Sequence, residues 1–421
     1  MATTVTSIAE ICATAKRASR TLAELDTNTR NAALHAVASA LELRTHEILE
    51  ANGRDLEAGR ESGLTAALLD RLALDERRVA EIARQVRDIA ALADPVGEVI
   101  EGRRLANGLE VRTVRVPLGV IAVVYEARPN VTIDAAALCL KSGNAIVLRG
   151  SSMAMHSNLV LAGIASEAVI EAGLPEGAMS LVAGGDRDEL EQLATQTGLV
   201  DLIIPRGGEG LKAALKGVAT VPVIYAASGN CHVYVEQTAD LQMAAAIALN
   251  AKVRKPSVCN AAETLLVDRA IADRFLPSAL RTLAEAGVEL RGDEHVREIA
   301  GDLSLSAATD EDWATEYLAL TLAVGVVDSV QEAIDHINRY GSGHSDAIVT
   351  RDTTAAHAFQ RGVDSACVYV NASTAFTDGG EFGMGAEIGN STQKLHARGP
   401  IGVRELCTYK YLVDGSGHVR G

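Results

Sequence analysis

The sequence predicts an α/β protein with two doubly wound parallel-sheet domains and a small additional β element. Short continuous apolar runs, such as 120–125, 145–148 and 264–267, alternate with helical stretches. This alternation is typical of βαβ units whose sheets are covered on both faces. The chain has 421 residues, more than one hydrophobic core normally serves, so we expect more than one domain.

The first part of the chain is helical and is followed by a hairpin. Residues 1–95 are rich in Ala, Leu, Glu and Arg at helical spacing and end at Asp94-Pro95, which predicts three or four helices. Asn107-Gly108 then separates two β-prone runs within 98–117. Asn-Gly between such runs is the strongest short hairpin signal. The hairpin is either an oligomerisation arm or a simple sheet edge.

Two alternating series follow the hairpin. Strands are expected at 120–125, 145–148, 179–182, 202–204 and 221–225 in the first series, and at 264–267, 320–327, 347–350 and 367–370 in the second. Residues 372–400 are glycine-rich with few periodic apolar positions. Long loops of this kind in compact domains are usually functional. A closing strand is expected within 406–413.

Composition excludes several classes of partner. The net charge of −16 argues against binding to nucleic acid, and only 3% of residues are aromatic. No apolar run is long enough to cross a bilayer, and no signal peptide is recognisable. The six cysteines are scattered without a C-x-x-C pair. We therefore expect reduced thiols, no metal site and a cytoplasmic location.

One cysteine stands beside a group of cations. Lys252, Arg254 and Lys255 closely precede Cys259. The thiolate is the nucleophilic form of cysteine, and nearby positive charge favours it. Most free cysteines are simply small buried hydrophobes, so this stretch alone leaves both interpretations open.

The usual dinucleotide fingerprint is missing. No G-x-G-x-x-G opens a helix after the first strand, and no P-loop is present. Polar segments nevertheless follow three strands, at 126–130, 149–152 and 205–210. Arg149 could meet a phosphate there, and Gly207-Gly208 would let a helix N-terminus approach one. Arg149 could equally be an ordinary surface cation.

The order of these features resembles the aldehyde dehydrogenase superfamily. The segments that carry the resemblance are 116–120, Pro129-Asn130, 143–149 and 258–261. Four further segments are similar to signature segments of the γ-glutamyl phosphate reductase family, the glutamate-5-semialdehyde dehydrogenases. These segments are 125–132, 229–235, 256–266 and 391–400.

The resemblance implies an aldehyde-dehydrogenase-like fold with defined domains. Residues 1–97 and 118–240 would form the cofactor-binding domain, and 241–400 the catalytic domain. Residues 98–117 and 401–421 would form the oligomerisation hairpin and strand.

The resemblance also implies the roles of individual residues. Cys259 would be the nucleophile, and Asn130, from the other domain, would stabilise the oxyanion. A turn role after Pro129 is the alternative for Asn130. The residues implied for NADPH or NADP are Arg149, Ser151, Gly207 and Glu316. The cations implied for the substrate phosphate are Arg128, Arg254, Lys255, Lys394, His396 and Arg398. Arg254 and Lys255 could instead form a solvated face.

One departure from the superfamily concerns the direction of the reaction. Oxidising members carry a glutamate in an E-L-G-G segment that activates water. The equivalent run here is Ala227-Ser228-Gly229-Asn230, which contains no acid. The absence of this acid is consistent with a reductase, because an activated water would hydrolyse the thioester that the resemblance implies on Cys259.

The implied function is the NADPH-dependent reduction of L-glutamyl 5-phosphate to L-glutamate 5-semialdehyde, with release of phosphate, through a cysteine thioester. This is the second step of proline biosynthesis from glutamate. The implied partners are the substrate, another copy of the chain and the upstream glutamate kinase. Two alternatives remain. The first is another enzyme of the superfamily, either an aldehyde-oxidising or a CoA-acylating aldehyde dehydrogenase. The second is a non-catalytic relative that binds nucleotides or partners.

Overall fold

The computed structural model describes residues 7–184, 186–225 and 228–420, and the chain divides into two compact units. The first unit comprises Met1–Tyr225, Met384–Gly389 and Ile401–Gly421. The second comprises Ala226–Gly383 and Asn390–Pro400.

The first unit begins with five helices instead of the three or four predicted. They are α1 (Ile8–Leu22), α2 (Thr27–Leu43), α3 (Thr45–Glu61), α4 (Ala66–Leu72) and α5 (Glu76–Ala91). Ser7, Asp26, Thr65 and Asp75 cap the starts of four of them. Arg44 alone separates α2 from α3. A break of one residue leaves the apolar periodicity nearly intact, which is why the sequence underestimates the number of helices.

A four-stranded parallel sheet forms the centre of the first unit. Its strands are β3 (Val120–Tyr125), β4 (Ala145–Arg149), β5 (Met179–Leu181) and β6 (Leu202–Arg206). They lie in the order β5-β4-β3-β6. Residues of β3 are fully buried because helices cover both faces of the sheet. The run at 221–225 is not a strand, and only an isolated bridge joins Val223 to Ile203.

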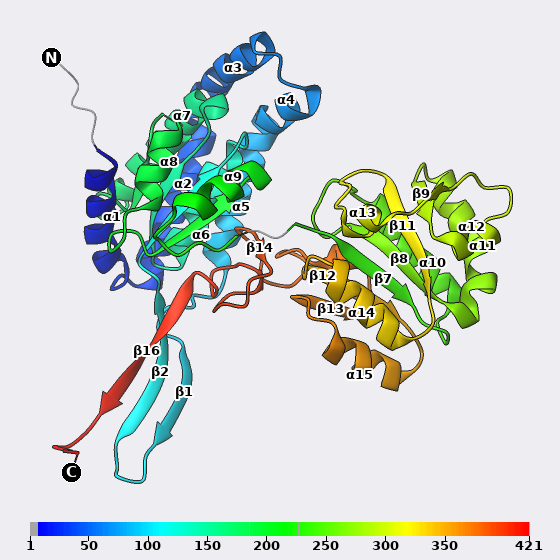
Figure 1. The fold of residues 1–421 in the computed structure, drawn as a ribbon. Helices are drawn as coiled ribbons and strands as arrows, with labels where there is room; N and C mark the ends of the chain where they lie inside the picture. Colours follow the sequence, from blue (N-terminus) through cyan, green and yellow to red (C-terminus); the bar gives the residue numbers. More distant parts are fainter. Residues whose placement is uncertain (1–6, 185, 226–227, 421) are drawn as a thin grey trace. The chain divides into compact units, whose positions relative to one another are not determined.

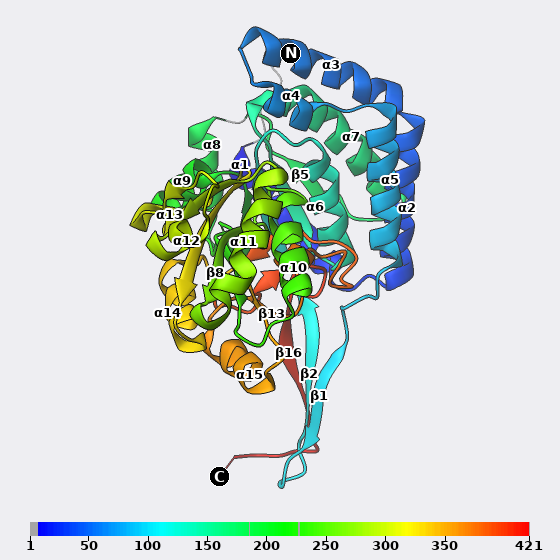
Figure 2. The same ribbon diagram turned by 90° about the vertical axis from the view of Figure 1, so that its right-hand side faces the viewer.

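The strand order places the helices of the first unit in layers. The helices that follow the four strands are α6 (Asn130–Lys141), α7 (Met155–Glu171), α8 (Arg187–Ala194) and α9 (Glu209–Val218). Right-handed crossovers put α6 and α7 on one face and α8 on the other, where α8 packs against α1. Helices α2 and α5 form an outer layer over α6 and α7 (Figure 2).

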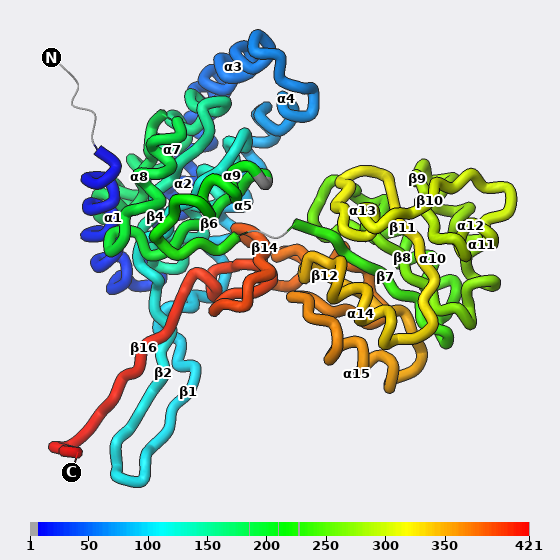
Figure 3. Tube along the Cα trace, in the orientation of Figure 1, coloured from blue at the N-terminus to red at the C-terminus, as the bar shows by residue number. Residues whose placement is uncertain are grey.

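The predicted hairpin and closing strand form a three-stranded antiparallel arm. The strands are β1 (Val99–Arg104), β2 (Glu110–Pro117) and β16 (Cys407–Asp414). The order is β1-β2-β16, and Gly108 takes a φ of +93° in the turn. The arm extends away from the helices of its unit (Figure 1). Strand β16 runs alongside β2, as the trace shows (Figure 3).

The second unit is built on a seven-stranded parallel sheet, which confirms the predicted second α/β domain. The strands are β7 (Cys231–Val235), β8 (Ala262–Asp268), β9 (Glu289–Gly292), β10 (Ser306–Ala307), β11 (Thr321–Val327), β12 (Ser345–Val349) and β13 (Cys367–Val370). Their order is β10-β9-β11-β8-β7-β12-β13. Because β7 lies inside this sheet, the unit begins at 226 and not at 241 as the sequence suggested.

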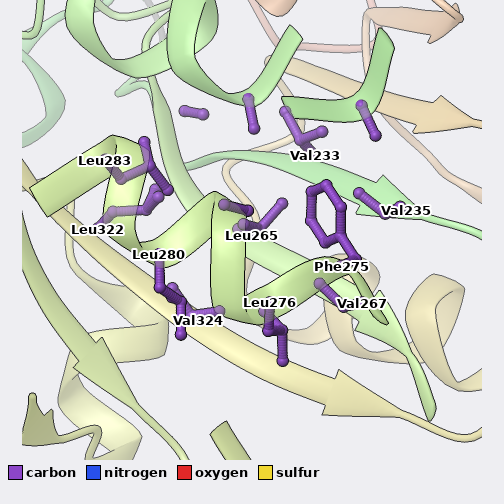
Figure 4. Close-up of a cluster of buried hydrophobic side chains, with 14 of the residues drawn as sticks. Val233, Val235, Leu265, Val267, Phe275, Leu276, Leu280, Leu283, Leu322 and Val324 are labelled. Atoms are coloured by element: carbon purple, nitrogen blue, oxygen red, sulfur yellow. The ribbon is translucent and has the colours of Figure 1, made fainter. Parts of the chain in front are cut away.

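Helices cover both faces of the second sheet. They are α10 (Leu241–Val253), α11 (Arg269–Glu285), α12 (Glu294–Ile299), α13 (Asp310–Ala314), α14 (Val330–Tyr340) and α15 (Thr353–Gly362). Val233 and Val235 pack with Phe275 and Leu276 of α11 on one face (Figure 4). Tyr234, between them, packs with Phe359 of α15 on the other. This alternation is the period of a β-strand.

The predicted loop at 372–400 contains only short elements. They are η2 (Thr374–Phe376), β14 (Asn390–Ser391) and β15 (Gly399–Pro400). Strands β14 and β15 pair with each other. The loop therefore belongs mainly to the second unit, although 384–389 returns to the first.

No apolar run was expected to be long enough to cross a bilayer, but among the described residues the helical stretch Ser152–Glu171 is long and apolar enough by length and composition. This stretch has half of its apolar window buried inside the protein. It consists of η1 (Ser152–Ala154) and α7, and α7 packs against α2 and α3. A core helix passes the same test of length and composition, so its place in the core accounts for its apolar character.

Asn144 connects three parts of the first unit, which generates a stability prediction. Its Oδ1 accepts from the N–H of Gly119 at 2.8 Å, and its Nδ2 donates to the carbonyl of Leu406 at 2.9 Å. We expect Asn144→Ala to lower the free energy of unfolding by about 2–4 kcal/mol, because each unpaired buried group costs about 1–3 kcal/mol. Urea unfolding followed by circular dichroism measures the loss.

The matched control is Asn28→Ala, because Asn28 is exposed near the start of α2. An equal shift of the urea midpoint in the two variants would contradict the role of Asn144.

Candidate active site

Cys259 lies in the turn that leads from α10 into β8. The N–H of Val258 donates to the carbonyl of Lys255 at 3.4 Å, and the N–H of Ala261 donates to that of Val258 at 3.1 Å. Cys259 is half-buried, whereas the other five cysteines are buried. Its place before β8 puts it at the amino end of that strand. Of the six thiols, Cys259 is thus the one that a solvent-borne reactant can reach, as a nucleophile requires.

A glycine-containing segment lies directly against the backbone of Cys259. A Cβ atom added to Gly229 would lie 1.8 Å from the carbonyl oxygen of Cys259. The Sγ of Cys231 donates to that same oxygen at 3.2 Å. Only glycine permits so close an approach. Two contacts from one segment therefore fix the peptide of Cys259.

The same segment joins Glu316 to the site. Oε1 of Glu316 accepts from the N–H of Gly229 at 2.6 Å. Nδ2 of Asn230 donates to the carbonyls of Trp313 and Tyr340 at 2.7 and 2.8 Å. The structure thus brings Glu316 and Cys259 to the same short segment. Ala227 of the acid-free run lies outside the described residues, which begin again at Ser228.

Asn260 holds the turn from the side of the glycine-rich loop. Its Nδ2 donates to the carbonyls of Thr377 and Ala375 at 3.0 and 3.3 Å. Oγ1 of Thr374 donates to the carbonyl of Asn260 at 2.7 Å. The loop that the sequence marked as functional therefore supports the residue next to Cys259.

The cations that precede Cys259 differ in their environment. Lys252 is fully buried and forms an ion pair with Glu263, which is also fully buried. Desolvation raises the pKa of Glu263 and lowers the pKa of Lys252. Arg254 and Lys255 are exposed. The charge of Lys252 is thus balanced inside the unit, which weakens the argument that a cluster of three cations activates Cys259.

The predicted cations of the glycine-rich loop gather around one acid. Lys394 and Arg398 both form ion pairs with Asp364, and Arg398 does so at 3.1 Å. Hydrogen bonding to Lys394, and then to Arg398, lowers the pKa of Asp364. His396 is exposed between them in the sequence. The negative charge of Asp364 offsets one of the two positive charges, of Lys394 and Arg398, that were predicted to bind the substrate phosphate.

In the first unit, Asn130 and Arg128 lie at the carboxyl end of β3. Asn130 is the first residue of α6, and its Nδ2 donates to Oδ2 of Asp134 at 2.8 Å. Arg206 ends the neighbouring strand, where it pairs with Tyr125. Desolvation, followed by repulsion from Arg206 and then from Arg71, lowers the pKa of Arg128. Arg128 therefore lies in the field of other arginines at the carboxyl ends of β3 and β6.

Arg149 and Ser151 lie at the carboxyl end of β4, where open α/β sheets bind ligands. Arg149 is 7% exposed, and its Nη2 donates to the carbonyl of Asp186 at 2.5 Å. Its Nε is buried without a partner among the described residues. Desolvation lowers the pKa of Arg149, opposed by Glu189 and Asp186.

A shallow hollow lies at these strand ends. Its lining includes Gly150, Ser151, Met155, Leu181 and Gly184. A Cβ added to Gly150 would lie 2.1 Å from Nδ2 of Asn158. Only glycine therefore permits the side chain of Asn158 to approach the backbone so closely. Oγ of Ser151 accepts from the N–H of Met153 at 3.1 Å. Ser151 thus lines the hollow, whereas Arg149, two residues earlier in the chain, is not among its lining residues.

Gly207 lies before α9, where the sequence predicted a phosphate contact. A carboxylate already stands at this helix N-terminus, because Oε2 of Glu126 accepts from the N–H of Gly208 at 3.1 Å. A Cβ on Gly207 would approach Glu126 and Leu211 within 2.9 Å. The glycine therefore serves the packing of Glu126 against the helix, and an anion here would have to displace that side chain.

Sequence reasoning missed three polar residues that touch the predicted site. Asp134 stands four residues after Asn130, a helical spacing that was itself a signal. Glu263 and Cys231 lie inside the family segments, but their contacts with Lys252 and Cys259 depend on the fold. Within the described part of the chain, no group of three or more His, Cys, Asp or Glu residues is arranged to hold a metal ion.

Comparisons with known proteins identify the family of the chain. Residues 1–297 and 308–410 match the aldehyde dehydrogenase family profile. The chain is 54% identical over 413 residues to the γ-glutamyl phosphate reductase of Thermobifida fusca, with 98% of each chain covered. It is 52% identical to that of Caldanaerobacter subterraneus, with 96% of this chain and 98% of the relative covered.

Comparison with solved structures identifies the same family. The structure is similar to that of γ-glutamyl phosphate reductase from Thermotoga maritima, with a TM-score of 0.96, 46% identity and coverage of 98% and 99% of the two chains. An acetylating aldehyde dehydrogenase from Geobacillus thermoglucosidasius, at 19% identity and a TM-score of 0.67 over 98% and 97% of the chains, shares the fold alone. The chain belongs to the aldehyde dehydrogenase family and, within it, to the γ-glutamyl phosphate reductases.

Proposed function

We propose that the chain catalyses the NADPH-dependent reduction of L-glutamyl 5-phosphate to L-glutamate 5-semialdehyde with release of phosphate. Membership of the family supports the semialdehyde dehydrogenase role. The observation that carries the mechanism is the half-buried thiol of Cys259, whose peptide is fixed by the acid-free residues 228–230. This would be the second step of proline biosynthesis from glutamate.

The first chemical step is acyl transfer to sulfur. The Cys259 thiolate attacks the γ-carbonyl carbon, a C–S bond forms, and the tetrahedral intermediate collapses with loss of phosphate and its bonding electrons. The amide of Asn130 donates to the oxyanion, and one such donor is worth roughly 3 kcal/mol in other enzymes. A thioester on Cys259 and free phosphate are the products of this step.

The thioester is then reduced. The nicotinamide cofactor that the family implies supplies the hydride when it is bound. The protein releases the aldehyde as the C–S bond breaks, and the electrons of that bond return to Cys259 as a thiolate. Residues 228–230 carry no carboxylate to activate water, so hydrolysis of the thioester to glutamate is suppressed.

The residues at the carboxyl end of β4 fit a nucleotide. The Nε of Arg149 is a buried donor without an acceptor among the described residues, and Gly150 and Ser151, which follow it in the chain, line a shallow hollow. We infer that Arg149 and Ser151 hold the adenosine end and that Glu316 holds the nicotinamide ribose. We assign Gly207 to the same proposed site, where a bound phosphate would displace Glu126 from the start of α9.

The phosphate of the substrate would meet the predicted cations. We assign this role to Arg128, Arg254, Lys255, Lys394, His396 and Arg398. Arg128 is supported by its neighbour Arg206, because two adjacent guanidinium groups favour a bound anion. Lys394 and Arg398 share Asp364, so their contribution is smaller than their number suggests.

We further infer a cytoplasmic homo-oligomer with no membrane or nucleic-acid partner. The arm of β1, β2 and β16 carries exposed apolar side chains, which supports pairing with another copy. They are Val99, Ile100, Tyr409, Tyr411 and Val413. An acyl phosphate is labile, so transfer from the upstream glutamate kinase is expected to occur close to this enzyme.

The reverse assay tests the nucleophile and the phosphate together. With glutamate 5-semialdehyde, NADP and inorganic phosphate, we expect NADPH to form, and Cys259→Ala to lower kcat more than about 10⁴-fold. Omitting phosphate removes the acceptor of the acyl group and stops the wild type. Absorbance at the NADPH band is the measurement.

Cys12→Ala is the matched control, since Cys12 is buried in α1. Turnover that proceeds without phosphate would point to an aldehyde-oxidising enzyme, and turnover that needs CoA instead of phosphate to an acylating one. Full activity of Cys259→Ala would exclude the thioester.

Gly229→Ala tests whether the close approach to Cys259 matters. The added Cβ cannot be accommodated 1.8 Å from a carbonyl oxygen, so the peptide of Cys259 must move. A displacement of about 1 Å costs roughly 100-fold in kcat, and we expect a loss of at least that size. Iodoacetamide labelling measures the accompanying change in Cys259 reactivity. Gly163→Ala in α7, where the added atom meets nothing within 4 Å, is the control.

Cofactor preference tests the role of Arg149. Its loss removes one charge-assisted hydrogen bond to a phosphate, so Arg149→Ala should raise the KM for NADPH by about 10–100-fold and change the KM for NADH much less. Arg187→Ala, which removes an exposed cation on α8, should change neither. Equal effects on both cofactors would show that Arg149 does not contact the 2′-phosphate.

A further inference from the structure

Asn130 and Asp134 form a pair on the first two turns of α6. The Nδ2 of Asn130 donates to Oδ2 of Asp134 at 2.8 Å. The other carboxylate oxygen, Oδ1, is shielded from solvent and has no partner among the described residues. A carboxylate with one satisfied and one orphaned oxygen is costly to bury. The small gain from a helical i,i+4 pair does not account for it.

The chemistry of the pair restricts the amide of Asn130. An asparagine side chain can turn over and exchange its oxygen for its nitrogen at nearly constant shape. Only the NH₂ end can donate to an oxyanion. An ionised carboxylate can only accept, so Asp134 selects the orientation in which the NH₂ group faces it. One N–H is then held by Asp134, and the second remains for a ligand.

We propose that Asp134 is a positioning residue that holds the amide of Asn130 in the orientation needed to donate to the oxyanion, an inference that rests on the proposed function.

Asp134 is mostly ionised at neutral pH, although its surroundings raise its pKa above the ordinary value. Burial raises the pKa of Asp134 to about 6, while the hydrogen bond from Asn130 and the charge of Arg206 oppose that rise. Arg206 lies at the end of β6, beside the end of β3. Asp134 therefore remains an acceptor at neutral pH. At lower pH the protonated acid could instead donate to the amide oxygen of Asn130 and stabilise the wrong orientation.

A double-mutant cycle on the full-length enzyme tests the proposal. The variants are Asn130→Ala, Asp134→Ala and the double variant, assayed in the phosphate-dependent reverse reaction. We expect Asn130→Ala to lower kcat by about 100-fold or more. Asp134→Ala should lower kcat by about 10-fold or more with little change in KM. The double variant should be no slower than Asn130→Ala, because Asp134 acts only through that amide.

The conservative variant Asp134→Asn keeps the size of the side chain and one acceptor oxygen. We expect it to recover part of the kcat that Asp134→Ala loses. Asp88→Ala, which removes an exposed acid from an i,i+4 pair with Arg84 on α5, should leave kcat unchanged. Thermal midpoints of all variants report whether the fold is retained.

The outcomes distinguish the positioning role of Asp134 from the proposed function on which it rests. Losses in kcat that multiply in the double variant would overturn the positioning role of Asp134 while leaving the proposed function intact. A fall in the thermal midpoint of Asp134→Asn with no fall in kcat would also overturn it. Unchanged kcat in Asn130→Ala would overturn the oxyanion role of Asn130 itself, and the role of Asp134 with it.

Discussion

The close approach of Gly229 to Cys259 is the constraint on which the second unit's site depends. No side chain fits between the two backbones, since even a Cβ would lie 1.8 Å from the Cys259 carbonyl oxygen. The same residue places Glu316 through its N–H, and Cys231 holds the oxygen from the next strand. Contacts to its backbone therefore hold Cys259 in a constant position within the second unit. Preorganisation of this kind is how rigid scaffolds contribute to rate.

Charge is distributed differently from what the order of residues suggests. Lys252 lies only two residues before Arg254 in the sequence, yet it forms a buried ion pair with Glu263. A buried ion pair costs desolvation and contributes little net stability, but breaking it would leave one charge buried alone. Arg254 and Lys255 remain exposed. In a protein of net charge −16, such local exceptions are what could attract an anionic substrate.

The α/β class, the two parallel sheets, the hairpin at Asn107-Gly108 and the closing strand were all predictable. Each depends on a local pattern, such as a continuous apolar strand or a turn dipeptide. The number of N-terminal helices and the boundary between the units were not. Arg44 interrupts a helix without breaking its periodicity, and β7 joins its sheet through partners more than 25 residues away. Patterns within a short window cannot report such pairings.

The site divides in the same way. Sequence by itself determined which residues are candidates for chemistry, because Cys259, Asn130 and the acid-free run at 227–230 are recognisable as residue types in order. Only the tertiary structure decided which partners the predicted residues have. Glu316 accepts from Gly229, Lys394 and Arg398 pair with Asp364, and Glu126 accepts from Gly208 at the start of α9. The reason is physical. A residue's type follows from the chain, but the field and hydrogen bonds around it come from segments that folding brings near, and these set its reactivity.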